Sequence, residues 1–289
     1  MAPLETLLSF VNTWECDEND HLNVQYYFAK FDEADRQFRQ MTGFSETLVG
    51  SRRVRHVRYH AELRAATLVK VRSYAAFDGP HMFSVVHEMI EGSTGEIAAT
   101  AIDGYTPNPS RAKTLRERFE KFEANLSEQA TPRTISASPF SGKPTMEELL
   151  GNGAVVTSRA SVLPRHLDSE YRAEDAFYLS CISDASSHAW ERTPMTMAWL
   201  YEKDYGRVAV EQKLTTLSPL ALGDMVAVVT SFTGVQGNTF NLRHHIFETK
   251  TNRLVAVCDM VALAMDLEKR SIVPLSEETK QQLHALQSM

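Results

Sequence analysis

The chain contains an internal repeat, which limits the folds it can adopt. Shifting the sequence by 157 positions superposes residues 60–104 on residues 217–261 without a gap and brings His87 onto His244. In both copies a run of side chains alternates between two faces, which is typical of half-buried antiparallel strands. Turn-forming residues divide these strands from one another. The sequence therefore predicts two related copies, each with about four antiparallel strands.

One helix precedes the strands in each copy. The first helix has apolar residues at three- and four-residue steps: Tyr27, Phe31, Ala34, Phe38 and Met41. This spacing predicts one buried face, and Gly43 follows as a C-terminal cap. A shift of 151 superposes this helix on a second one, from about Ala176 to Trp190, which is rich in small residues. The two different shifts imply an insertion in the second copy.

The joint between the copies is marked by prolines: Pro107, Pro109, Pro132, Pro139 and Pro144. Residues 114–126 within it resemble a charged surface helix. We therefore expect a first domain over residues 1–106, a linker over 107–153 and a second domain over 154–289.

Composition narrows the classes of protein further. With 289 residues, 43% apolar and 23% charged, the chain matches a well-packed globular protein. No window approaches the ~20 apolar residues of a membrane span, and the N-terminus lacks the features of a secretory leader. We expect a cytoplasmic protein. The net charge of −7 argues against a nucleic-acid partner.

The three cysteines, Cys16, Cys181 and Cys258, are few and widely spaced, which fits reduced thiols better than a disulfide framework or a metal site. Cys16 precedes Asp17, and an adjacent carboxylate raises the pKa of a thiol. We therefore expect Cys16 to be a small buried side chain and not a nucleophile.

Residues 14–34 read WECDENDHLNVQYYFAKFDEA and place a polar turn directly before the first helix. A carboxylate from Asp17 or Asp20 would face the helix N-terminus, whose unpaired N–H groups polarise a carbonyl. This arrangement suits acyl transfer. The alternative is structural: Asp20 or Asn23 caps the helix and Asp17 is a solvated turn residue.

The turn resembles that of hotdog-fold thioesterases of the 4-hydroxybenzoyl-CoA type. Their pattern is Asp, two residues, Gly, His or an apolar residue, then Asn and Tyr, and Asp17, His21, Asn23 and Tyr27 fill those places. Asp20 replaces the usual glycine, and Asp tolerates the positive φ of such a bend. The resemblance implies an α+β fold of two fused hotdog domains, each a curved antiparallel sheet wrapped around one central helix.

The resemblance also implies an acyl-CoA thioesterase that needs no cofactor and no metal. Asp17 would be the base or nucleophile, with Asn23 beside it. Asp184, on a helix like that of the acyl-CoA thioesterase II group, either assists Asp17 or pairs with His188 as helix support.

The expected substrate-binding residues are His21, Tyr26, Tyr27, Arg53 and Arg55. Guanidinium groups suit the phosphates of coenzyme A, although a solvated strand edge explains the arginines equally well. The tyrosines suit an acyl pocket, with core packing as the alternative.

Aligning His166 and Leu167 with His21 and Leu22 puts Val162 opposite Asp17. We therefore expect one working site, with Asp17 from the first copy and walls from the second. Two alternatives stay open: a hydratase or dehydratase on the same fold, because Asp17, Asn19 and His21 resemble the hydratase motif, and a non-catalytic acyl-CoA-binding module. A homo-oligomer of the fused chain is also open.

Overall fold

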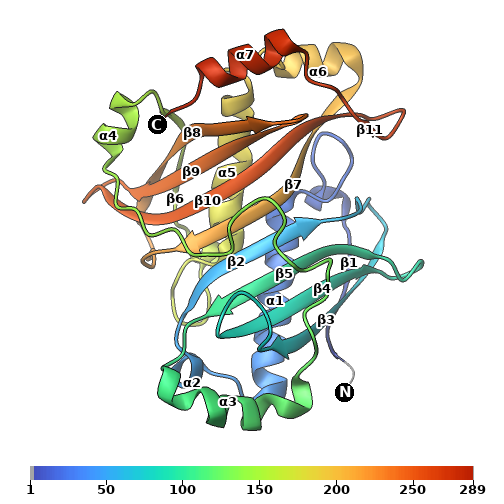
Figure 1. Ribbon diagram of the computed structural model, residues 1–289, viewed down its shortest axis with the longest axis vertical. Coiled ribbons are helices and arrows are strands. Elements are labelled where there is room, and N and C mark those ends of the chain that lie inside the picture. The colour runs from blue at the N-terminus through green and yellow to red at the C-terminus, as the bar shows by residue number, and fades with distance from the viewer. Residues whose placement is uncertain (1–2, 289) are drawn as a thin grey trace. The chain divides into compact units, whose positions relative to one another are not determined.

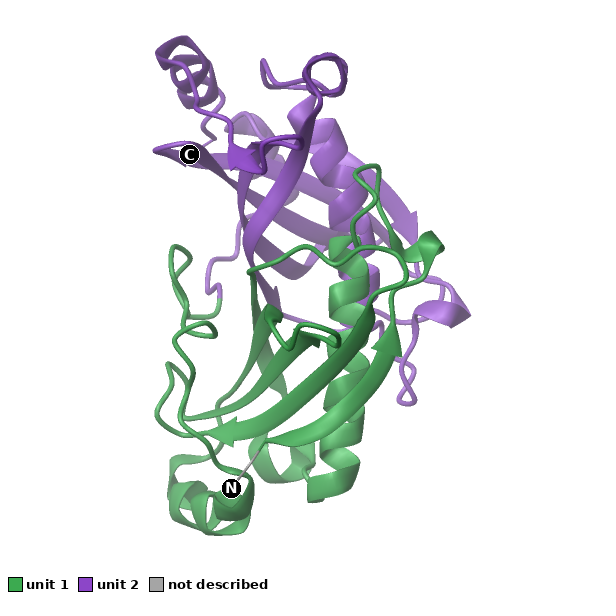
Figure 2. Ribbon diagram, turned by 90° about the vertical axis from the view of Figure 1, so that its right-hand side faces the viewer, with its two compact units in different colours: residues 1–139 green, residues 140–289 purple. Residues whose placement is uncertain are grey.

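The computed structural model describes residues 3–288, and the chain divides into two compact units, Met1–Pro139 and Phe140–Met289 (Figure 2). The boundary lies inside residues 107–153, the segment expected to join the two copies. No helix in the described part is long and apolar enough to cross a membrane.

The first unit contains one five-stranded antiparallel sheet with the order β1-β3-β4-β5-β2 (Figure 1). Its strands are β1 (Leu4–Phe10), β2 (Arg52–Tyr59), β3 (Leu68–Ala76), β4 (Phe83–Glu91) and β5 (Ile97–Tyr105). Its α-helices are α1 (Val24–Thr42), α2 (Glu46–Val49) and α3 (Ala112–Phe119), and its 3-10 turns are η1 (Thr13–Glu15), η2 (Pro109–Arg111) and η3 (Glu120–Phe122).

The second unit repeats this plan with the strand order β6-β8-β9-β10-β7. Its strands are β6 (Val155–Ser161), β7 (Tyr205–Thr216), β8 (Met225–Gln236), β9 (Thr239–Glu248) and β10 (Arg253–Asp266), with the short β11 (Ser271–Ile272) paired to β10. Its helices are α4 (Met146–Gly151), η4 (Pro164–His166), α5 (Asp175–Trp190), α6 (Met197–Lys203) and α7 (Glu277–Ala285).

The long helix of each unit packs on its own sheet in the same way. Helix α1 contacts β1, β3 and β4, and α5 contacts the equivalent strands β6, β8 and β9. Each unit is therefore an antiparallel sheet wrapped around one helix, and the predicted double-hotdog fold is confirmed. Gly43 ends α1 in the left-handed conformation (φ +66°), as expected, but Met41 is 52% exposed and does not lie on the buried face.

The predicted surface helix in the joint is shorter and less exposed than expected. Helix α3 ends at Phe119, and Leu115 and Phe119 are buried. They pack with Phe38 of α1 and Phe83 of β4 in one apolar cluster. This helix therefore closes one end of the first unit's core.

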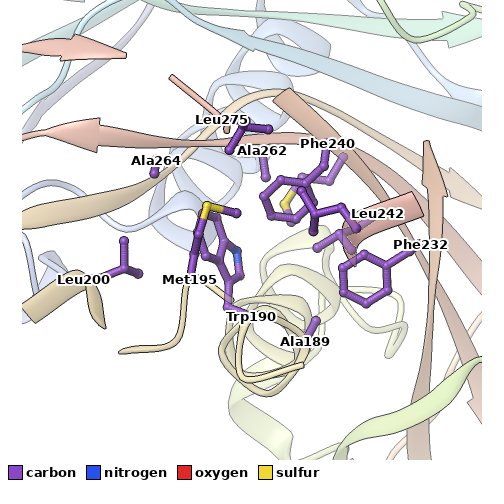
Figure 3. Packing of buried hydrophobic residues seen from close by; sticks show 12 residues of the cluster. Ala189, Trp190, Met195, Leu200, Phe232, Phe240, Leu242, Ala262, Ala264 and Leu275 are labelled. Atoms are coloured by element: carbon purple, nitrogen blue, oxygen red, sulfur yellow. The ribbon is translucent and has the colours of Figure 1, made fainter. Parts of the chain in front are cut away.

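One apolar cluster in the core of the second unit includes Trp190, the last residue of α5 (Figure 3). The Trp190 indole lies edge-on to the Phe240 ring of β9, with ring centroids 4.9 Å apart. Met195 and Leu200, from the segment after α5, complete the cluster.

At equivalent positions, strand β4 of the first sheet buries His87 and strand β9 of the second sheet buries His244. His87 Nδ1 lies 2.7 Å from Ser73 Oγ, and His244 Nδ1 lies 2.8 Å from Thr230 Oγ1. Both side chains are fully buried. Both histidines are therefore core residues with one hydrogen bond each to a neighbouring strand.

Buried histidines on β9 make the second unit sensitive to acid. Burial and then the neighbouring His245 lower the pKa of His244 to about 3, and burial and then Arg243 lower the pKa of His245 to about 4, with Asp259 opposing both shifts. An unfolded histidine has a pKa of about 6.5, so below that pH the unfolded chain binds more protons than the folded one. Stability is therefore lost as the pH falls from about 6.5 toward 4.

We expect this loss to reach about 1.4 kcal/mol per pH unit for each histidine where the folded form is neutral and the unfolded form is charged. Thermal unfolding of the wild type and of His244→Gln between pH 7 and pH 4 measures it. The slope of stability against pH should be smaller in the variant by the equivalent of one bound proton. Equal slopes for the two proteins would contradict the assignment of this acid sensitivity to His244.

Candidate active site

The turn before α1 is closed by the side chain of Asp17. Its Oδ1 accepts hydrogen bonds from the backbone N–H groups of Asn19 (2.9 Å) and His21 (3.4 Å). The Asp17 N–H donates to the His21 carbonyl (2.8 Å), and the Asp20 N–H donates to the Asp17 carbonyl (3.1 Å). Asp20 has a φ of +59°, so the bend survives without glycine, as expected. These bonds fix the Asp17 carboxylate at the entrance to α1.

Asn23 is the N-cap of α1. Its side-chain oxygen accepts from the Gln25 N–H (3.0 Å), and its own N–H donates to the Glu15 carbonyl (2.9 Å). Asn23 therefore caps the helix, which is the structural alternative that the sequence predicts for it. Asp20 makes no such cap and is exposed at the tip of the turn.

The loop between β2 and β3, residues 60–67, lies against this turn. The Leu22 N–H donates to the Leu63 carbonyl (2.7 Å), and His21 pairs with Arg64 through the backbone. The buried His21 ring reaches Glu62, with Nε2 3.1 Å from Oε2. Sequence reasoning missed Glu62, because no local pattern links a loop glutamate to a turn so far away in the chain.

This loop carries a backbone conformation that alanine adopts at a cost. Ala66 has a φ of +70°, and its N–H donates to the Val11 carbonyl (2.8 Å). In the second unit Gly223 occupies the equivalent place with a φ of +85° and donates to the Val162 carbonyl (3.0 Å). Non-glycine residues in this region are strained and concentrate at functional sites.

A Cβ added at Gly223 would meet no atom within 4 Å. Gly223→Ala therefore tests only the cost of a positive φ in a residue with a side chain. We expect it to lower the free energy of unfolding by about 1 kcal/mol, and Ala66→Gly to change it by less than that in the opposite direction. Denaturant unfolding measures both. A neutral Gly223→Ala would show that the positive φ carries no strain.

Tyr27 lies one helical turn beyond the cap and is buried. Its ring meets Tyr59 edge-on, with centroids 5.1 Å apart. Burial raises the pKa of its hydroxyl, a hydrogen bond with the Leu63 backbone opposes this, and the Asp17 carboxylate raises it further. Tyr27 therefore stays protonated within electrostatic range of Asp17, whereas Tyr26 is only half-buried.

The pKa of the Cys16 thiol is raised, chiefly by burial, with Asp17, Asp20 and Glu15 adding to it. Cys16 is only half-buried, so the expectation of a buried side chain is wrong, whereas its raised pKa agrees with the expectation that it is not a nucleophile.

The two arginines expected to bind phosphate have opposite surroundings. Arg53 is exposed on β2, whereas Arg55 is 1% exposed and enclosed by carboxylates. Its Nε and Nη2 each lie 2.7 Å from the Asp103 carboxylate, and its Nη1 lies 2.5 Å from Asp32 Oδ1. The expectation that Arg55 binds a coenzyme A phosphate is wrong, because no phosphate reaches a guanidinium paired on both sides in the core.

The same buried network contains His87 and Asp35, whose ligand atoms lie with one of Asp103 within 4.8 Å of one another. Burial alone would raise the pKa of Asp103, but the guanidinium groups of Arg55 and Arg52 hold it well below its usual range. A divalent cation here would add buried positive charge next to two guanidinium groups, which is costly. These residues fit a charge-balanced structural network and do not fit a metal centre.

The second unit carries a turn with the same geometry, built on Asp168. Its Oδ1 accepts from the N–H groups of Glu170 (2.8 Å) and Arg172 (2.9 Å), and Tyr171 has a φ of +59°. Asp168 therefore corresponds to Asp17, at the same shift of 151 as the helices. The expectation that Val162 stands opposite Asp17 and that the second turn lacks a carboxylate is wrong.

The two turns differ in the charge beside the carboxylate. Asp168 Oδ2 lies 3.3 Å from the Nε of Arg172, which forms an ion pair with it. The equivalent of Arg172 in the first unit is His21, which faces Glu62 instead. Asp184 lies further along α5 and is exposed.

Comparisons with known proteins agree with this architecture. The sequence model of the thioesterase-like superfamily matches residues 162–283. No curated protein matches the chain. A protein from Lactobacillus plantarum, provisionally assigned as an oleoyl thioesterase, has a similar solved structure (TM-score 0.62, 13% identity), covering 90% of this chain and 96% of its own.

Two acyl carrier protein thioesterases have similar structures as well. The 12:0-ACP thioesterase of Umbellularia californica gives a TM-score of 0.59 at 11% identity, covering 89% of this chain and 92% of its own. An acyl-ACP thioesterase of Bacteroides thetaiotaomicron gives 0.55 at 8% identity, covering 89% and 96%. The chain is therefore a double-hotdog protein, and within its second unit residues 162–283 are similar to the thioesterase-like superfamily.

Proposed function

We propose that this protein hydrolyses acyl thioesters, with Asp17 of the first unit as the general base or nucleophile. The observation that carries the proposal is the Asp17 carboxylate, which two backbone N–H groups hold at the turn leading into α1. A thioester carbonyl is already electrophilic, so a positioned carboxylate and an oxyanion donor are sufficient chemistry.

The surroundings of Asp17 supply the other parts of such a site. The N-terminal end of α1 carries partial positive charge, which favours the oxyanion of a tetrahedral intermediate. His21 lies 3.1 Å from Glu62, and this contact orients its ring. A ring N–H of His21 is the candidate donor to the developing negative charge or to the departing thiolate.

The thiol carrier is coenzyme A or an acyl carrier protein, which present the same phosphopantetheine thioester. The similar solved structures include acyl-ACP thioesterases, and the turn resembles that of acyl-CoA thioesterases. Arg53, exposed on β2, is the remaining candidate of the two arginines for a phosphate contact.

Release of free thiol from short, medium, branched and aromatic acyl-CoAs, measured beside acyl carrier protein thioesters, tests this function. Thiol release establishes hydrolysis, and the preferred carrier identifies the substrate class. A change in enoyl absorbance without thiol release would favour the hydratase, which Asn19 and His21 near Asp17 also suit. Thermal stabilisation by an acyl-CoA without any turnover would favour a binding module.

A further inference from the structure

A buried ion pair connects α1 to the residues just before the Asp17 turn. Lys30 of α1 is 6% exposed, and its ammonium donates to Glu15 Oε1 (2.8 Å), the Phe10 carbonyl (3.2 Å) and Ser9 Oγ (3.3 Å). These three acceptors use all three N–H groups of a lysine. The side chain therefore has one defined position, tied to the end of β1 and to η1.

Glu15 also forms hydrogen bonds with residues on both sides of the turn. Its Oε2 accepts from the Asn12 N–H (2.8 Å) and from Asn12 Nδ2 (3.2 Å). Its backbone carbonyl accepts from the N–H of Asn23, the cap of α1. The pair therefore joins the residues that enter the turn to the helix that leaves it.

The second unit builds an equivalent turn without this pair. At the shift of 151, His166 stands in the place of Glu15 and Cys181 in the place of Lys30. His166 Nδ1 still accepts the Leu163 N–H (3.0 Å), but its ring packs on Phe177 with centroids 4.6 Å apart. The fold therefore does not require the ion pair, and burying two charges costs desolvation free energy.

We propose that Lys30 and Glu15 are positioning residues, which hold the Asp17 turn against α1 so that the carboxylate keeps its reactive orientation. This inference rests on the proposed function of Asp17. A displacement of about 1 Å in a reacting group costs up to ~100-fold in rate, so a rigid tie at this place affects turnover more than substrate binding.

The double variant Glu15→Gln with Lys30→Met tests the inference. Glutamine keeps an acceptor for the Asn12 N–H and methionine keeps the length of lysine, while both charges are removed together. Replacing a buried pair by isosteres of similar volume is often neutral or stabilising. We expect an unchanged or higher melting temperature, a kcat at least ~10-fold lower and a KM within about threefold.

A matched control removes an ion pair from the outer face of the same helix. Glu33→Gln with Arg36→Met deletes a pair whose side chains are 39% and 43% exposed, and kcat should not change. If the first double variant is poorly folded, Glu15→His with Lys30→Cys replaces it, because the second unit accommodates those residues at an equivalent turn.

Asp17→Asn and the wild type are assayed on the same thioester to separate the two claims. An active wild type, an inactive Asp17→Asn and a slow, folded Glu15→Gln/Lys30→Met variant support the positioning role. Full kcat in the folded double variant overturns the positioning role and leaves the function of Asp17 in place. A wild type without thiol release overturns the proposed function and this inference with it.

Discussion

Asp17→Asn is expected to lower kcat for thiol release by at least ~100-fold while leaving the fold intact. Asparagine keeps a side-chain oxygen that accepts from the N–H groups of Asn19 and His21, so the turn is retained. What is lost is the negative charge and basicity that a nucleophile or base requires. Steady-state kinetics with circular dichroism measures both parts of the expectation.

The chain contains its own control for this substitution. Asp168→Asn makes the same chemical change in a turn of the same geometry, where Arg172 already pairs with the carboxylate. We expect kcat to stay within about twofold. Loss of activity in Asp168→Asn with retention in Asp17→Asn would move the site to the second unit, and equal losses would mean that both turns act.

The fold was predictable because its signals are local and occur twice. Strand alternation around His87 and His244, the apolar face of α1 and the cap at Gly43 each follow from spacing within a few residues. The Asp20 bend was predictable for the same reason, since its positive φ depends on the tolerance of one residue. The Asp17 turn was predictable in the same way, because it depends on residues close together in the sequence and on no long-range contact.

The predicted alignment of the second turn with the first is wrong because it follows two identical residues and not the shift that superposes the two helices. His166 and Leu167 match His21 and Leu22 in type, yet the hydrogen bonds match Asp168 to Asp17. The shift of 151 therefore holds for the turn and helix together, and the insertion lies between the helix and the strands. A search for an Asp directly before the second helix at that shift would have found Asp168.

Contacts between distant segments account for the residues that sequence reasoning missed or misplaced. Glu62 reaches His21 from a loop, and Lys30 meets Glu15 across the turn. Arg55 was expected to contact a coenzyme A phosphate or to lie on a solvated strand edge. Its burial depends on carboxylates from α1 and β5, which no local pattern brings together.

Arg55→Gln is expected to be among the most destabilising single changes in the first unit, at about 3–5 kcal/mol. The arginine bridges Asp32 and Asp103, and Asp103 is completely buried. Removing the cation leaves these carboxylates without their main compensating charge, although Arg52 still contacts Asp103 at 3.1 Å. Denaturant unfolding, with the melting temperature as a second readout, measures the loss.

The second unit shows how the same position is filled without charge. Gln212 and Met260 pair across β7 and β10 in the register that Arg55 and Asp103 occupy across β2 and β5, and Gln212 Nε2 lies 3.3 Å from Met260 Sδ. Ser183 stands in the place of Asp32.

Transplanting these three residues gives Asp32→Ser, Arg55→Gln and Asp103→Met in one chain. This triple variant should recover most of the stability that Arg55→Gln loses, because no charge of the bridge stays buried and unpaired. If the triple variant is no more stable than Arg55→Gln, uncompensated charge is not the cause of the loss. Packing of the arginine side chain would then carry the stability of this part of the core.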